Sequence, residues 1–233
     1  HTWSLAVEEQ YYLVFPFLLL AIYRWSREQV RVLLLAAMLI SFLFAVWFTS
    51  FNAASSFYML SSRFWELLAG AVLASIQYRY PAKRSIALLN HTLPVLGLLL
   101  IIYSFIFLEY DSNHPGFVTL VPVVGTALII WFASKGDLAT KLLASRGFVA
   151  IGLISYSLYL WHFPIFAFAR NMGVDISVNE KLVCILLTFI LSVLSYSLVE
   201  KPFRNRKKIS VKKLLIILSF TSLVVVTFIT YAI

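Results

Sequence analysis

Several apolar stretches of this sequence carry side chains that could perform acid–base chemistry. Glu8 and Glu9 begin one such stretch, Arg63 and Glu66 lie inside another, and His162 lies inside a third. Ionisable groups at these depths are costly, and they usually face a bundle interior or a wet cavity. A carboxylate in such a place could polarise or deprotonate a hydroxyl, and an imidazole could transfer a proton.

The stretch 152–168 surrounds His162 with hydroxyl and indole groups that could orient a substrate. On a helix, Ser155, Tyr159 and His162 recur at i, i+4 and i+7 and therefore share one face. Two interpretations stay open. The imidazole transfers protons, or it is a structural histidine that bonds to a Ser or Tyr on a neighbouring helix.

The two acidic stretches also allow two interpretations each. Glu8 could act on a substrate hydroxyl, or it could anchor the chain at the interface together with nearby aromatic residues; for Glu9 we favour anchoring. Arg63 and Glu66 have the i, i+3 spacing of an ion pair, which could be structural or could contact substrate. Downstream, Gly70 and Ala74 predict an edge for close helix approach.

The composition is that of a chain with many membrane-spanning helices. Of the 233 residues, 61% are hydrophobic and 12% are charged, and the mean hydropathy is +0.90. A soluble domain of this size carries more charge. The net charge of +9 does not indicate nucleic-acid binding, because the basic residues form short clusters between apolar runs and no nucleic-acid module is visible.

We therefore expect an all-α, polytopic integral membrane helical bundle. A span needs about 20 apolar residues, and about eight stretches qualify by this measure. Pro122 and Gly125 in the fifth predict a kink or a re-entrant path, and Pro164 in the sixth predicts a kink or an end. The stretches are 5–23, 32–50, 57–77, 86–108, 117–133, 147–168, 182–199 and 213–233.

The charges of the loops predict the orientation. Most of the 19 Lys and Arg residues lie in alternate loops, so these basic loops are expected in the cytoplasm, with both ends of the chain outside. This orientation places Glu8, the Arg63–Glu66 pair and His162 in the outer half of the membrane. The basic loops are 24–31, 79–84, 135–146 and 200–213.

The last basic loop could have a second role. Arg204, Arg206 and Lys207 could bind the phosphates of a cytosolic donor such as a coenzyme A thioester, although retention of positive charge in the cytoplasm explains the same residues. We expect no metal site and no bound cofactor, because His91 and His114 have no ligand spacing. The sequence also contains no phosphate-binding glycine loop and no GxSxG element.

Taken together, four motifs in order resemble the membrane acyltransferase family 3: HTWSLAVEEQYYLVFP, RFWELLAGAVLAS, GLISYSLYLWHFPIF and VEKPFR. The resemblance covers about residues 1–204, which correspond to the later part of the family's domain. It implies an O-acyltransferase of the bacterial inner membrane that uses an acyl-CoA, commonly acetyl-CoA. The implied acceptors are envelope carbohydrates such as lipopolysaccharide O-antigen, exopolysaccharide or peptidoglycan.

The resemblance also implies roles for individual residues. Glu8 matches the acid of the family's WSLxxE motif, and Glu66 and His162 match later motifs, so Glu8 and His162 are the catalytic candidates. The family's main catalytic histidine belongs to an earlier helix that this sequence does not contain, and we expect this part of the protein to be inactive alone. The candidate substrate-binding residues are Ser4, Arg63, Glu66, Ser155, Tyr159 and Trp161.

The resemblance divides the chain into a membrane domain, 1–208, and an additional helix, 209–233, which would lead to an extracytoplasmic SGNH-type domain. The expected partners are membrane lipid, the acyl-CoA and the carbohydrate, with no nucleic acid. Two other functions remain open. A transporter or flippase would line its pathway with the same ionisable groups, and a membrane scaffold would use them only to hold helices together.

Overall fold

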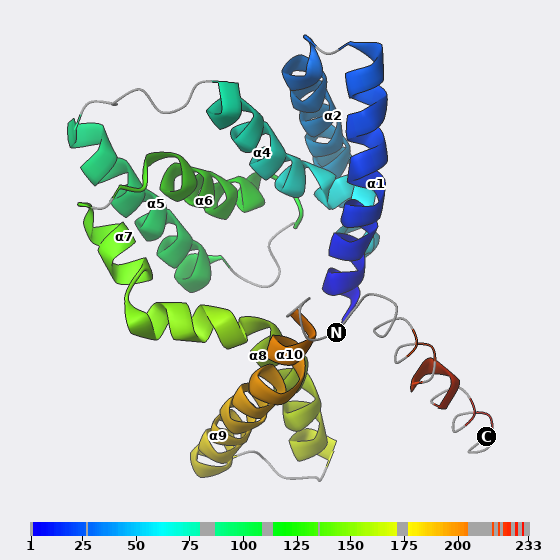
Figure 1. The fold of residues 1–233 in the computed structure, drawn as a ribbon, viewed down its shortest axis with the longest axis vertical. Helices are drawn as coiled ribbons and strands as arrows, with labels where there is room; N and C mark the ends of the chain where they lie inside the picture. The colour runs from blue at the N-terminus through cyan, green and yellow to red at the C-terminus, as the bar shows by residue number, and fades with distance from the viewer. Residues whose placement is uncertain are drawn as a thin grey trace. The chain divides into compact units, whose positions relative to one another are not determined.

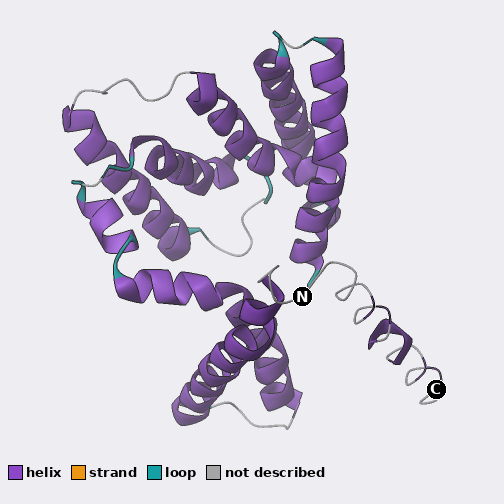
Figure 2. Cartoon of the chain, in the orientation of Figure 1, coloured by secondary structure: helices purple, strands orange, loops and turns teal. Residues whose placement is uncertain are grey.

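The computed structural model describes residues 2–26, 28–79, 87–108, 114–134, 136–171 and 177–204, together with 216, 219, 221–224, 227 and 230. Every regular element in these ranges is helical (Figure 2), which confirms the all-α prediction. The chain forms two compact units, His1–Ser145 and Arg146–Ile233. We describe each unit by itself.

The described residues of the first unit form seven α-helices and one short 3-10 turn, most of which are labelled in Figure 1. The long helices α1, α2 and α4 pack together, and α5 packs against α6. The elements are α1 (Trp3–Trp25), α2 (Val30–Phe51), α3 (Ala53–Tyr58), α4 (Leu60–Arg79), α5 (Ala87–Phe107), η1 (Phe117–Thr119), α6 (Leu120–Phe132) and α7 (Leu138–Leu143).

The second unit contains α8 (Arg146–Asn171), which packs against α9 (Val178–Ser195). A π-helical turn, η2 (Tyr196–Glu200), and α10 (Lys201–Arg204) continue α9. α9 begins with a capping box, because Ser177 accepts from the Glu180 amide and Glu180 accepts from the Ser177 amide. Pro164 lies inside α8, which continues to Asn171. Of the two predicted outcomes, the helix end does not occur, and the kink stays a prediction.

Several helices have the length and composition of membrane spans. Five qualify within the described residues, and the helical stretch Phe117–Phe132 is apolar but shorter. The chain therefore belongs to a multi-pass membrane protein. α4 also forms where a span was expected, but its 20 residues are more polar. The predicted span 213–233 lies largely outside the described residues. The five are Trp3–Trp25, Val30–Phe51, Leu89–Phe107, Arg146–Asn171 and Val178–Arg204.

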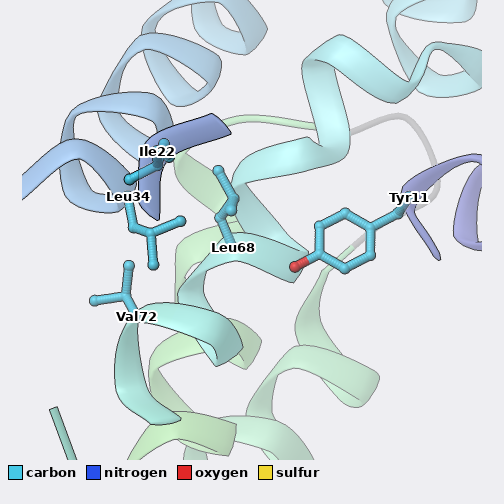
Figure 3. Packing of buried hydrophobic residues seen from close by; sticks show 5 residues of the cluster. All are labelled: Tyr11, Ile22, Leu34, Leu68 and Val72. Carbon is cyan, nitrogen blue, oxygen red and sulfur yellow. The ribbon is translucent and has the colours of Figure 1, made fainter. Parts of the chain in front are cut away.

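A cluster of buried side chains holds α4 against α1 and α2. It comprises Tyr11 and Ile22 from α1, Leu34 from α2, and Leu68 and Val72 from α4. Figure 3 shows the aliphatic members pointing toward one another, with the Tyr11 ring extending toward Leu68. Between helices in a membrane, such close packing stabilises association because lipid is as apolar as the side chains.

Polar groups fix the register of α4 along α2. The Ser41 hydroxyl donates to the carbonyl of Ser61 over 2.6 Å, and it accepts from the amide of Trp65 over 3.0 Å. Ser41 is buried, so these bonds form away from competing solvent. They position the first two turns of α4, which carry Arg63 and Glu66.

The helices α5 and α6 approach each other closely where they cross. A Cβ atom added to Gly97 would lie 2.5 Å from the carbonyl oxygen of Gly125, and one added to Gly125 would lie 2.7 Å from that of Gly97. Only glycine permits this distance between two backbones. Gly125 therefore belongs to a helix crossing, and α6 is continuous through both Pro122 and Gly125. The helix therefore has no break at these two residues, and the kink or re-entrant path stays a prediction.

The prediction of close helix approach at Gly70 is wrong. A Cβ atom added to Gly70 would meet nothing within 4 Å in the described part of the chain. The GxxxA spacing shows only that the side chains along this edge of α4 are small. Small side chains can line a cavity as well as a contact with another helix. Gly70 lines a cavity between α4 and α6.

Candidate active site

The start of α1 and the first turns of α4 bring four predicted site residues together. Ser4 and Glu8 are one turn apart on α1, and Arg63 and Glu66 are one turn apart on α4. All four line one pocket of about 30 Å³, which also involves Val7 and Leu67. Two acidic groups, one guanidinium and one hydroxyl thus converge from stretches that lie far apart in the sequence.

Arg63 and Glu66 form an ion pair within α4. Nε and Nη2 of Arg63 donate to Oε2 of Glu66 over 3.3 and 3.1 Å, and the two side chains are 26% and 15% exposed. Both donors reach the same carboxylate oxygen. Within the described residues, Oε1 of Glu66 receives no hydrogen bond, so this oxygen can accept from a ligand hydroxyl.

Aromatic rings fix the position of the Arg63 guanidinium. Its carbon lies 5.8 Å from the ring centroid of Trp3 and 5.6 Å from that of Phe57, and these two rings contact each other at 4.4 Å. Cations within about 6 Å of a ring face are attracted by its quadrupole. Trp3 belongs to the predicted WSLxxE motif, so one function of its indole is to position Arg63.

The sequence interpretation missed one residue near this cluster, His114. It lies in the turn before η1, where Pro115 and Gly116 are buried. The turn is anchored by the Thr49 hydroxyl, which donates to the Pro115 carbonyl over 2.8 Å. Nδ1 of His114 lies 3.2 Å from Oγ1 of Thr119, which also accepts from the Gly116 amide over 3.2 Å.

The positive charge of Arg63 affects the protonation of His114. Burial, and then the positive charge of Arg63, lower the pKa of His114 from its ordinary value of 6.5. The imidazole is therefore neutral near pH 7 and can accept a proton. No local pattern pointed to this residue, because a search for metal-ligand spacing cannot find a histidine whose relevant neighbour is a distant arginine.

The second unit positions His162 and its neighbours along α8. Nδ1 of His162 lies 3.1 Å from the carbonyl oxygen of Leu158, and the rings of Tyr159 and His162 are 5.7 Å apart. If Nδ1 carries the proton it donates to this carbonyl, and Nε2 is then the acceptor. Ser155 donates to the carbonyl of Gly152 in its own helix over 2.8 Å, and Trp161 is 36% exposed.

Arg204 already has an acidic partner. Its Nη1 lies 3.2 Å from Oε1 of Glu200, and Oε2 of Glu200 lies 3.4 Å from the hydroxyl of the buried Ser157 on α8. The Arg204 side chain is 66% exposed, so it remains accessible to an anion. Arg206 and Lys207 lie outside the described residues, and their expected contact with donor phosphates stays a prediction.

The family match decides the class of the protein. The family described as "Acyltransferase domain" matches residues 1–199. The chain belongs to this acyltransferase family. Both units, and hence both the Glu8–Arg63–Glu66 pocket and the His162 helix, contribute to the matched range.

Curated relatives of this acyltransferase chain carry related names. It is 28% identical over 217 residues to the O-acetyltransferase OatA of Staphylococcus aureus strain NCTC 8325, and it has the same identity to OatA of strain MRSA252. The alignment covers 88% of this chain and 36% of each relative. The chain thus spans about a third of the length of these relatives. No solved structure matches it significantly.

The candidate site of this chain offers acid–base groups. Within the described ranges, no group of three or more His, Cys, Asp or Glu side chains could hold a metal ion. The ion pair, the second carboxylate and the neutral imidazole of the first unit are suited to moving a proton and stabilising negative charge.

We expect the protein to lose stability on acidification through His114. The folded state binds fewer protons than the unfolded state below pH 6.5, since the pKa of His114 is lowered. The free energy of unfolding therefore decreases as pH falls below about 6.5 and stops decreasing below the folded-state pKa. In detergent, His114→Gln should reduce the loss of melting temperature between pH 7.5 and 5.5. An unchanged loss would show that His114 is not the group responsible.

Proposed function

We propose that the protein containing this chain is an integral membrane O-acyltransferase. It would move an acyl group from a coenzyme A thioester to a hydroxyl of a cell-envelope carbohydrate. The observation that carries the proposal is the convergence of Glu8 with Arg63 and Glu66 on one pocket, in a chain of the acyltransferase family. The names of the relatives, O-acetyltransferases, support the transfer to oxygen.

The residues of the pocket suit the chemistry of this transfer. In the reaction, the acceptor oxygen attacks the thioester carbonyl carbon, the C–S bond breaks, and the hydroxyl proton ends on the leaving thiolate. Glu8 would take the proton from the hydroxyl, and Arg63 would stabilise the negative charge that develops on the carbonyl oxygen. Glu66 would hold the guanidinium in place through its two hydrogen bonds.

The other candidates would serve the same transfer from different places. His162 would relay a proton through Nε2, while Ser4, Ser155, Tyr159 and Trp161 would contact the acceptor. Arg204, Arg206 and Lys207 would bind donor phosphates on the cytoplasmic side. This arrangement follows from the charge of the loops, and labelling that finds Glu8 accessible only from the cytosol would contradict it.

The experiment that tests the proposal compares surface glycans from cells with and without the full-length protein by mass spectrometry. Cells with the protein should carry an additional acyl mass, and Glu8→Gln should abolish it with unchanged protein level. Glu9→Gln is the matched control, because Glu9 has the same charge but does not line the pocket. Unmodified glycans in all strains would contradict the proposal and favour a transporter. Loss of the assembled Glu8→Gln protein would favour a scaffold.

A further inference from the structure

An apolar groove of about 340 Å³ lies between α4 and α6. α4 contributes Glu66, Ala69, Gly70 and Leu73, at the spacing of one helix face. α6 and the turn before it contribute a second stripe that runs from Thr119 to Ile130 with the same periodicity. Small-molecule sites have volumes from about 300 Å³, with mostly apolar walls and few polar groups.

The groove follows one face of α6 over several turns. At 1.5 Å per residue, the stripe from Thr119 to Ile130 extends about 16 Å along its helix. The side-chain amide of Gln77 donates to the carbonyl of Ile130 over 3.3 Å and joins the two helices at that end. Midway along the groove, Gly70 has no side chain to fill the space beside α4. A Cβ atom added there would meet nothing within 4 Å in the described part of the chain.

The other end of the groove is polar and meets the candidate active site. Glu66 lines both the groove and the pocket that contains Glu8, and its carboxylate is bonded to Arg63. Thr119 is next to His114. A ligand in the groove would therefore have its polar end beside the guanidinium and its remaining length against apolar walls.

We propose that this groove binds the acyl chain of the donor, with the thioester carbonyl at the Glu66 end, and that the chain is longer than acetyl. The inference rests on the proposed function and adds the substrate class to it. A carbohydrate does not fit this lining, because its hydroxyls would lack hydrogen-bond partners. A nucleotide does not fit either, since its phosphates would be unpaired. An acetyl group has one methyl beyond its carbonyl and leaves such a groove empty.

The test uses the full-length protein in membranes and a series of acyl-CoA donors from acetyl to octanoyl. The wild type should transfer or bind the longer chains in preference to acetyl. Gly70→Leu should fill the groove and lower the ratio of octanoyl to acetyl use by about 10-fold or more, since each methylene in an apolar pocket changes discrimination by about 10- to 200-fold. Gly147→Leu is the matched control, because a Cβ atom added to Gly147 would also meet no described residue within 4 Å, and Gly147 lies in the second unit.

A second measurement does not depend on turnover. A coenzyme A thioester of a diazirine-bearing octanoic acid should label peptides of α4 and α6 on irradiation, and Gly70→Leu should abolish the labelling. Two results would overturn the inference. One is that the Gly70→Leu variant is labelled in the same peptides as the wild type. The other is that α6 is labelled by a diazirine phospholipid but not by the thioester probe. Labelling without any transfer to glycans would support the groove and contradict the proposed function. Transfer of acetyl groups alone to glycans would support the proposed function and contradict the binding of a longer acyl chain in the groove.

Discussion

Replacing Arg63 by glutamine is expected to lower acyl transfer by about 100-fold or more, the range found when a donor to a developing oxyanion is removed. Among the described residues that line the pocket shared by Glu8 and Glu66, Arg63 carries the one cationic group. It is fixed by Glu66 and by the rings of Trp3 and Phe57. Glutamine keeps a hydrogen-bond donor but removes the charge, so the loss should appear in kcat more than in KM.

The control must separate chemistry from folding, because Arg63→Gln also leaves the carboxylate of Glu66 without its partner. The double variant Arg63→Gln with Glu66→Gln removes both charges, and it should regain thermal stability without regaining activity. Arg79→Gln, at the other end of α4, should keep full activity. If the double variant recovered transfer, Arg63 would have only a structural role.

The second large effect is expected at the crossing of α5 and α6. Gly97→Ala places a methyl group 2.5 Å from the backbone oxygen of Gly125, and backbone cannot rotate away as a side chain can. The helices must separate, at a cost of about 1–3 kcal/mol typical of overpacking. Leucine at the same position should prevent the folded protein from accumulating.

Thermal unfolding in detergent and the amount of protein in membranes measure this effect. Gly147→Ala is the control, because its Cβ atom would meet none of the described residues within 4 Å and alanine favours a helix over glycine by up to about 1 kcal/mol. We expect the Gly97→Ala protein to melt several degrees lower and the control to melt at or above the wild-type temperature. Equal melting of the two variants would show that the crossing tolerates a wider separation.

The sequence predicted what depends on local periodicity. The length of the apolar stretches predicted the long helices. The i, i+3 spacing predicted the Arg63–Glu66 ion pair, because both residues lie on one helix. The order of the motifs gave Glu8 as a site residue, but its position beside Arg63 depends on how α1 packs against α4. That packing results from the buried Tyr11, Leu34 and Leu68, whose partners no linear pattern specifies.

Two features could not be predicted because they depend on contacts between distant segments. His114 is brought to Arg63 by a turn that Thr49 anchors, and a hydroxyl-to-carbonyl bond of this kind has no sequence signature. Gly70 was predicted to contact a helix and instead lines a groove. The spacing of small residues is identical in the two cases, and only the location of α6 distinguishes them.

The polar composition of α4 has a consequence for how the protein is synthesised. An arginine or an acidic residue opposes insertion by the translocon by up to about 2.5–3.5 kcal/mol, the value at the centre of a helix, and α4 carries both kinds of residue in its first two turns. α4 alone therefore enters the bilayer poorly, but the α1–α2 hairpin offers it the Ser41 hydroxyl and an apolar surface. We expect α4 to leave the translocon only after α1 and α2 have done so, which makes its insertion a cooperative step of biogenesis.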